Sequence, residues 1–165
     1  MISLVLPHLQ RLGAVSPDLI HSKLYDEVTF YQKFANDLKH CRKEVIIESP
    51  YVTSQRMYHL KPTLKSLVDR KVKVYVVTRD PNDHEVLMRK QAESEIKWFQ
   101  TVGVQVIISS NHNHRKLAIL DRKVLWEGSL NILSQGSSRE IMRRIDSKSQ
   151  ARECFEFVNL GRYVY

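Results

Sequence analysis

The sequence has few cysteines, few glycines and prolines, and no long hydrophobic run. Cys41 and Cys154 are its only cysteines, and neither belongs to a Cys-x-x-Cys pair, which argues against a zinc ribbon or a thioredoxin-like site. We expect two partly buried thiols in a reduced domain. No apolar stretch approaches the roughly 18 residues of a transmembrane helix. Residues 1–15 lack the basic start and long apolar centre of a secretory signal. These absences predict an unprocessed cytoplasmic protein.

With only five glycines and five prolines, the chain has no linker-like stretch that would divide it. Its 165 residues suit one domain with a single substantial core. We expect a catalytic domain over residues 26–165. Residues 1–25 are predicted to be an N-terminal extension of unclear role and a candidate docking segment for a larger assembly.

The charge balance is strongly basic, with 26 Lys and Arg against 18 Asp and Glu and a pI near 9.6. Such a surplus favours phosphate-rich partners, because neutralising phosphates releases condensed counterions. A basic surface that serves only solubility is the alternative. The sequence has no basic amphipathic helix with an aromatic face, the pattern that would indicate membrane binding. Anionic membrane surfaces would also attract a basic protein, but the lack of such a helix disfavours that route. We therefore predict a nucleic-acid partner and no membrane.

Helix-like and strand-like patterns alternate along the chain. Val28, Tyr31, Phe34 and Leu38 have the spacing of an amphipathic helix. Helices are predicted over 26–43, 56–70, 83–101 and 147–158, with a short one after Asn131, and strands over 44–50, 72–78, 104–109, 115–121, 124–128 and 139–145. The tail, 160–165, is predicted to be an edge strand or frayed. Buried strands alternating with helices indicate an α/β fold, a mixed β-sheet flanked by helices on both faces.

The stretch from 114 to 131 carries the strongest signal. It has the form His-x-Lys-x4-Asp-x6-Gly-Ser-x-Asn, made by His114, Lys116, Asp121, Gly128, Ser129 and Asn131. At roughly 5% per residue type, six fixed positions match by chance with odds on the order of 10⁻⁸ per starting point. The pattern resembles the signature of the phospholipase D superfamily, which also implies an α/β fold. Residues 21–23 repeat His-x-Lys, but no Gly-Ser-x-Asn follows, so the chain has one motif.

Residue chemistry assigns roles within the motif. On a strand, His114 and Lys116 project to the same side, about 6.6–6.8 Å apart along the backbone. A neutral histidine can attack phosphorus and later return a proton, and a lysine can stabilise the oxygens of the five-coordinate state. Asp121 has the opposite parity and lies beside a turn, so we expect it to brace that turn or pair with a cation.

The remaining motif residues complete a phosphate site. Asn131 supplies an amide donor, Gly128 permits close backbone approach, and the Ser129 hydroxyl suits phosphate or a histidine. None of these groups requires a metal, because side-chain cations and amide donors can do the electrostatic work that divalent ions do elsewhere. We therefore predict no metal and no cofactor.

The resemblance implies two further features. Relatives carry an acid about ten residues after the Asn, which is Glu140 here, where it would orient a catalytic imidazole. A surface glutamate paired with Arg143 or Arg144 is the alternative. Short relatives with one motif resemble bacterial nucleases that dimerise. We therefore predict a twofold homodimer with one composite site, in which one His114 forms a phosphohistidine and its symmetry mate protonates the leaving oxygen.

The favoured function is a metal-independent phosphodiesterase that hydrolyses nucleic acid as an endonuclease, with DNA favoured over RNA. A phospholipase or phosphatidyl transferase, or a nucleic-acid-binding subunit of a restriction or helicase assembly, are the alternatives. Tyr51 or Thr53 is expected either to contact substrate or to pack, His112 either to line the pocket or to face solvent, and Trp98 and Trp126 to be core. The predicted nucleic-acid-binding residues, with a solvated charged face as the alternative, are Arg139, Arg143, Arg144 and Lys148.

Overall fold

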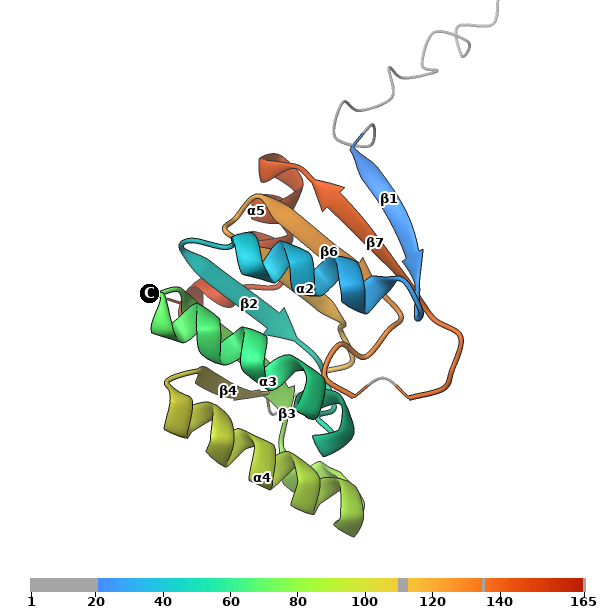
Figure 1. Cartoon of the computed structure of the whole chain (residues 1–165), viewed down its shortest axis with the longest axis vertical. Helices are drawn as coiled ribbons and strands as arrows, with labels where there is room; N and C mark the ends of the chain where they lie inside the picture. Colours follow the sequence, from blue (N-terminus) through green and yellow to red (C-terminus); the bar gives the residue numbers. More distant parts are fainter. Residues whose placement is uncertain (1–20, 110–112, 135, 165) are drawn as a thin grey trace, which may run out of the picture.

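The computed structural model describes residues 21–109, 113–134 and 136–164. In these residues a seven-stranded sheet has the order β1-β7-β6-β5-β2-β3-β4 (Figure 1). Its strands are β1 (Ser22–Asp26), β2 (Glu44–Glu48), β3 (Lys73–Arg79), β4 (Gln105–Ser109), β5 (Leu117–Leu120), β6 (Val124–Gly128) and β7 (Ile141–Asp146). The helices are α2 (Phe30–His40), α3 (Ser54–Asp69), α4 (Val86–Val102) and α5 (Lys148–Phe157), with 3₁₀ turns η1 (Pro81–Asp83) and η2 (Leu160–Arg162).

The sheet is mixed, as the sequence predicted. Strands β2, β3 and β4 are parallel, whereas β5, β6, β7 and β1 follow one another in antiparallel pairs. Helices α2, α3 and α4 cover one face of the sheet and α5 covers the other (Figure 1). The α/β fold with helices on both faces is therefore confirmed.

Each face of the sheet has its own apolar core. Phe30, Phe34 and Trp126 pack with their rings about 5–6 Å apart on the face of α2 and α3. A smaller cluster under α5 and η2 includes Ile119, Leu125 and Ile145. Alternate residues of β5 and β6 supply the two cores, because successive side chains of a strand point to opposite faces. Both faces of the central strands are thus buried, which explains their continuous apolar sequences.

Local hydrogen bonds overturn two sequence expectations. The Asp26 carboxylate accepts hydrogen bonds from Val28 N and from both N and Oγ of Thr29. This local turn competes with helix, so α2 begins at Phe30 and not at residue 26. The short helix predicted after Asn131 is also wrong, since residues 132–134 form a turn closed by Ser134 N and Asn131 O.

The two ends of the described chain pack against the sheet. In the segment that the sequence left unassigned, β1 pairs antiparallel with β7 as an edge strand. The tail is neither an edge strand nor frayed over its described part, because η2 follows α5 and Val164 is buried. Of residues 1–25, predicted as an N-terminal extension and candidate docking segment, 22–25 belong to β1 and 1–20 lie outside the described residues. No helix among the described residues has the length and apolarity that a membrane span needs.

Candidate active site

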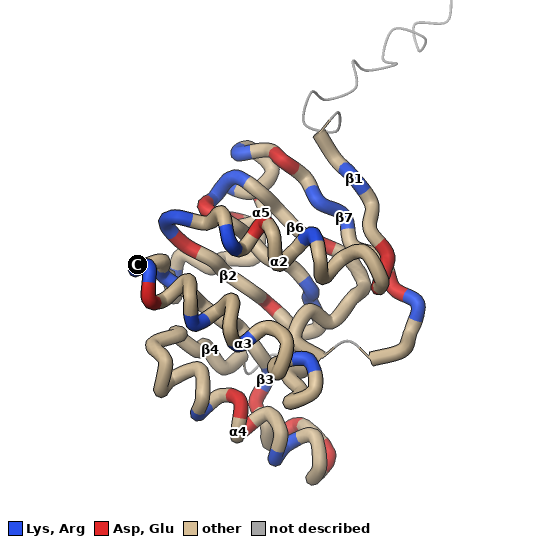
Figure 2. The backbone as a smooth tube through the Cα atoms, viewed as in Figure 1, with Lys and Arg blue, Asp and Glu red and all other residues tan. Residues whose placement is uncertain are grey.

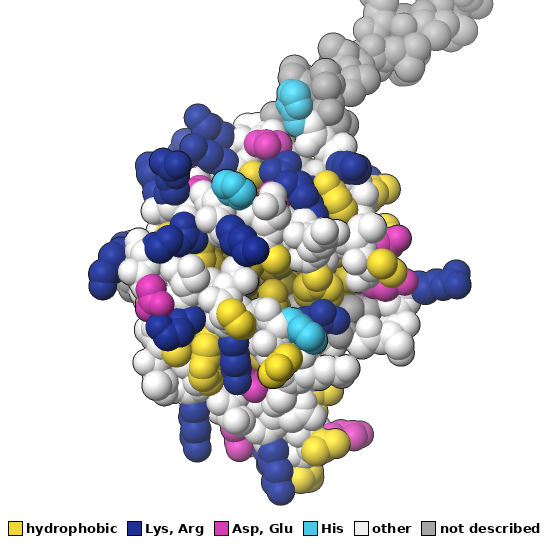
Figure 3. Space-filling model, viewed as in Figure 1, with side chains coloured by type: hydrophobic (Ala, Val, Ile, Leu, Met, Phe, Trp, Pro, Cys, Tyr) yellow, Lys and Arg dark blue, Asp and Glu magenta, His cyan; other side chains and the backbone are white. Residues whose placement is uncertain are grey.

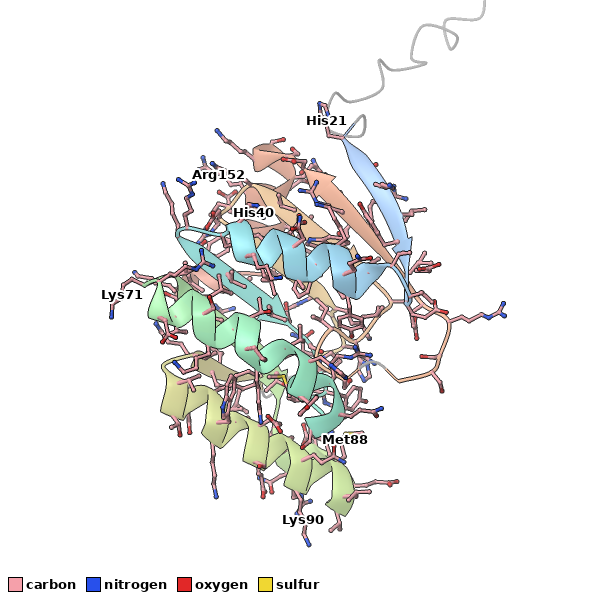
Figure 4. The ribbon with its side chains drawn as sticks, viewed as in Figure 1. His21, His40, Lys71, Met88, Lys90 and Arg152 are labelled. Carbon is pink, nitrogen blue, oxygen red and sulfur yellow. The ribbon has the colours of Figure 1, made fainter. Side chains whose placement is uncertain are left out.

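The motif residues gather at one end of the strands, along the side of the sheet where β2, β3 and β6 end and β5 and β7 begin. We call this the motif edge. It forms because β5 runs antiparallel to β2, with Leu117 opposite Glu48, and β6 returns to place Glu127 opposite Leu117. The arrows of β2 and β3 point to it at the lower right of Figure 1. Met88 and Lys90, in the first turns of α4, lie on this side in Figure 4, whereas His40 and Lys71 lie on the opposite side.

His114 precedes β5 and is exposed at the motif edge. Its Nε2 lies 3.2 Å from a terminal nitrogen of Arg79, the last residue of β3. The Tyr51 ring, from the segment after β2, lies 5.9 Å from the imidazole in an edge-to-face arrangement. Three separate segments of the chain therefore meet around this imidazole.

The contact with Arg79 fixes the protonation of the neutral imidazole. A guanidinium has only N–H donors and stays protonated in proteins. Nε2 of His114 must therefore accept, which puts the proton of the neutral ring on Nδ1. In this tautomer Nε2 presents a lone pair, the form that a nucleophile needs.

Lys116 lies beside His114. Its Nζ donates to the backbone oxygen of His114 at 2.5 Å. Between them, Arg115 makes a two-pronged ion pair with the carboxylate of Glu48, which is only 1% exposed at the end of β2. Because that carboxylate is buried, the pair anchors the segment from 114 to 116 against β2.

Gly128 and Ser129, at the end of β6, pack against the start of β7. Ser129 N donates to Ile141 O at 3.0 Å, and Ile141 N donates to Ser129 Oγ at 3.2 Å. A Cβ at Gly128 would lie 2.2 Å from Ile141 O and 2.9 Å from Met142 Cα. The glycine is therefore required for the close approach of the two strands.

Asn131 lies in a segment attached to the end of β2. Leu133 N donates to Ser49 Oγ, and Thr53 N donates to Leu133 O. The Oδ1 atom of Asn131 is buried without a hydrogen-bond partner among the described residues. Such an unsatisfied acceptor is rare in a folded protein. Only the amide Nδ2 of Asn131 could donate to a phosphate oxygen.

Asp121 lies apart from the other motif residues, at the opposite end of the four-residue strand β5 from the motif edge. It has φ 50°. Its carboxylate accepts hydrogen bonds from the backbone N–H groups of Arg42, Lys43 and Glu44 at 2.8–3.0 Å. These bonds hold the loop between α2 and β2 to the β5–β6 turn.

Glu140 immediately precedes β7 and is half-buried. Its carboxylate accepts a hydrogen bond from Ser138 Oγ at 3.1 Å, and its backbone N–H donates to Glu27. Because Ser129 bonds to Ile141, Glu140 and Ser129 lie next to one another at the motif edge. An acid at this position can orient a histidine that enters the site.

The four predicted nucleic-acid-binding residues separate in space. Arg139 is exposed at the motif edge. Arg143 lines a groove together with Lys116, and its guanidinium donates to Ser22 Oγ at 3.3 Å. Arg144 instead donates to Asp37 of α2 at 2.7 Å, and Lys148 begins α5 at the opposite edge. The motif edge thus has two of the four.

Other cations gather at the opposite edge, where β2 and β3 begin. Three loops there, 41–43, 70–72 and 121–123, supply Arg42, Lys43, Arg70, Lys71, Arg122 and Lys123. Figure 2 shows blue segments at the left ends of these elements, and Figure 3 shows Lys and Arg side chains over the left and upper part of the same face.

Sequence reasoning missed Arg79 and His84. The rings of Tyr51 and His84 lie 5.0 Å apart, and His84 is 8% exposed. Burial, together with the positive charge of Arg79, lowers the pKa of His84 below the ordinary histidine value. One signal was present for Arg79, since it directly follows a predicted strand, where ligands of α/β proteins bind.

The other candidate ligands and nucleophiles are accounted for. Trp126 is fully buried and Trp98 packs against the core, so the prediction that both are core is confirmed. Burial raises the pKa of the Cys41 thiol to about 12 and that of Cys154 to about 11. Both thiols therefore stay protonated at neutral pH and are weak nucleophiles. Among the described residues, no group of three or more His, Cys, Asp or Glu side chains could hold a metal ion. His112 lies outside these residues.

Comparison with known proteins assigns the family. The sequence profile of the PLD-like domain of cardiolipin synthase matches residues 34–158, most of the chain. The chain belongs to the phospholipase D-like family. A search of curated protein sequences finds no significant match.

Several solved structures have the same fold. The chain is similar to Nuc from Salmonella typhimurium, with a TM-score of 0.68, 13% identity, and 82% and 90% of the two chains covered. It is similar to NucT from Helicobacter pylori, with a TM-score of 0.64 and 18% identity over 82% of this chain and 91% of NucT. It also resembles phosphatidylserine synthase from Haemophilus influenzae, with 0.64 and 15%, over 86% of this chain but 38% of the synthase.

Proposed function

We propose that this phospholipase D-like protein is a metal-independent endonuclease. It cuts nucleic acid through a phosphohistidine on His114, at an active site shared by two copies of the chain. The observation that carries the proposal is the environment of His114. Its imidazole is exposed, its Nε2 lone pair faces Arg79, and its backbone oxygen accepts a hydrogen bond from Lys116. A nucleophile with one cation at its reactive nitrogen and a second at its backbone suits attack on an anionic phosphodiester.

The proposed reaction has two displacements. In the first, the Nε2 lone pair forms a bond to phosphorus while the bond to the leaving oxygen breaks, and that oxygen takes a proton from the second copy's histidine. In the second displacement, the second copy's histidine removes a proton from water. The water oxygen attacks phosphorus, and the P–N bond to the first copy's His114 breaks. Lys116 and Asn131 donate to the nonbridging oxygens in both steps.

Charge and size support a nucleic-acid substrate. The formal net charge of +8 favours a polyanion, and Arg139 and Arg143 lie at the motif edge as candidate phosphate contacts. The chain matches Nuc and NucT over nine-tenths of their lengths, but phosphatidylserine synthase over little more than a third of its length. We infer DNA in preference to RNA.

An apolar groove beside the motif supports dimerisation. It has a volume of about 430 Å³, and its lining includes Lys116, Gly128, Leu24, Ile141 and Phe157. The last three are large apolar side chains, and each is more than half exposed. Because exposed apolar groups favour association and this groove adjoins two motif residues, a second copy seated here would bring its own motif close to the first.

Cleavage assays in excess EDTA test this function. Wild-type protein should cut plasmid or single-stranded DNA in EDTA, and His114→Ala should abolish cleavage. His40→Ala, which removes a histidine at the opposite edge, is the matched control and should leave the rate unchanged. Cleavage that EDTA stops would contradict the metal-free mechanism. Salt-sensitive DNA binding without any cleavage would instead indicate a binding subunit.

A further inference from the structure

We propose that Arg79 is a further catalytic residue, which binds a nonbridging oxygen of the phosphodiester and, before substrate arrives, holds Nε2 of His114 as a hydrogen-bond acceptor. The inference rests on the proposed function, since it names a phosphate ligand for the same site. Arg79 lies 35 residues before His114 and is no part of the His-x-Lys motif.

The Arg79 guanidinium is buried but incompletely satisfied. The residue is only 8% exposed. One terminal nitrogen donates to Tyr51 Oη at 3.3 Å and to His114 Nε2 at 3.2 Å. Its other terminal nitrogen lies 3.8 Å from an Asp83 carboxylate oxygen, and its Nε is buried without a partner among the described residues. Buried charges are costly unless they are closely paired, so this arrangement favours the binding of an anion.

The geometry places that anion at the nucleophile. In a reactive complex, phosphorus approaches Nε2 to roughly 3–3.5 Å. Because phosphorus needs the same lone pair, the Arg79 nitrogen that now bonds to Nε2 moves aside and donates to a neighbouring nonbridging oxygen. Arg79 therefore exchanges one acceptor for another, giving up the Nε2 lone pair and donating to the phosphate.

The exchange leaves the proton balance of the reaction unchanged. Arg79 stays protonated throughout, because a guanidinium does not deprotonate in proteins. The released lone pair forms the N–P bond, and the electrons of the breaking P–O bond go to the leaving oxygen. Arg79 stabilises the charge that builds up on the nonbridging oxygens, as oxyanion donors do elsewhere. Tyr51 acts as a positioning residue, because its hydroxyl oxygen accepts from the same guanidinium nitrogen.

Two measurements on Arg79→Met and Arg79→Lys test the inference without a nucleic-acid substrate. The first is binding of orthovanadate, which mimics five-coordinate phosphorus. Arg79→Met should weaken it by about tenfold or more, and Arg79→Lys should restore part of the loss, because lysine keeps the charge but not the fork of donors. The second is the His114 tautomer, from long-range ¹⁵N–¹H NMR above the ordinary histidine pKa of about 6.5. Wild type should have an unprotonated Nε2, and Arg79→Met a mixture of tautomers.

Arg89→Met is the control, since Arg89 is a nearby cation on α4 that donates to Asn82 O. It should leave both measurements at wild-type values. Folding of each variant is checked by its melting temperature. Wild-type vanadate affinity and an unchanged His114 tautomer in folded Arg79→Met would overturn the inference, even if His114-dependent cleavage is found. Conversely, losses in both measurements would support Arg79 as a phosphate ligand even if nucleic acid is not cut. Where cleavage is found, Arg79→Met should slow it by about 10²–10³-fold.

Discussion

At the scale of single residues, the six motif positions separate into two groups. His114, Lys116, Gly128, Ser129 and Asn131 lie at or next to the motif edge, whereas Asp121 lies at the other end of β5, where it accepts three backbone hydrogen bonds. The sequence could predict this separation, because Asp121 has the opposite strand parity and adjoins a turn. It could not predict Arg79, because only folding brings residue 79 to residue 114.

Asp121→Ala should therefore reduce stability without removing the chemistry. Losing a charged acceptor of three N–H groups should lower the free energy of unfolding by about 2–4 kcal/mol. Urea unfolding measures this change. The cleavage rate, taken at a temperature where the variant is folded, should stay within a few-fold of wild type. Asp69→Ala is the control, because the exposed Lys65–Asp69 pair should contribute at most about 1 kcal/mol. Full stability with lost cleavage in Asp121→Ala would instead make Asp121 a catalytic residue.

At the scale of elements, hydrophobic periodicity predicted the helices and strands from α2 to α5 to within a few residues at each end. It missed β1, because three of the five residues of this edge strand are exposed and no apolar alternation marks it. It also extended α2 too far toward the N-terminus, since the Asp26–Thr29 hydrogen bonds leave no trace in an apolar pattern. Edge strands and side-chain turns depend on polar contacts that periodicity does not report.

The β6–β7 pairing gives an element-scale prediction. Gly128→Ala should lower the free energy of unfolding by about 1–3 kcal/mol, because its Cβ would collide with the backbone of β7. Cleavage should fall as well, since Ser129 and Glu140 flank the same pairing. Gly136→Ala is matched to it, because a Cβ there meets nothing within 4 Å. The control should change stability by less than about 0.5 kcal/mol. Equal stability of the two variants would mean that β6 and β7 separate easily at this point.

At the scale of the whole molecule, the sequence gives the amount of charge but not its location. The net charge predicted a polyanionic partner, yet three loops at the edge away from the motif hold many of the cations (Figure 2). Of the predicted set, Arg144 pairs with Asp37 across the α2–sheet interface. Charge counting could not separate such structural cations from those that face a substrate.

The shared active site predicts how mixtures of subunits behave. If each site needs His114 from both copies, only dimers of two wild-type chains are active. When wild type and His114→Ala exchange subunits, the activity should then follow the square of the wild-type fraction. Mixtures with His40→Ala should keep full activity. A linear dependence on the wild-type fraction would contradict a composite site.

Sedimentation should find wild type as a dimer and Ile141→Asp, which charges the apolar groove, as a folded monomer.

The most direct test of the account is isolation of the covalent intermediate. Wild-type protein is mixed with an oligonucleotide in excess EDTA and quenched in alkaline denaturant, where a phosphohistidine survives, and its peptides are analysed by mass spectrometry. The account predicts a nucleotide attached to the peptide that contains His114, and no adduct in His114→Ala. Cleavage without an adduct at His114, or an adduct on another residue, would contradict it.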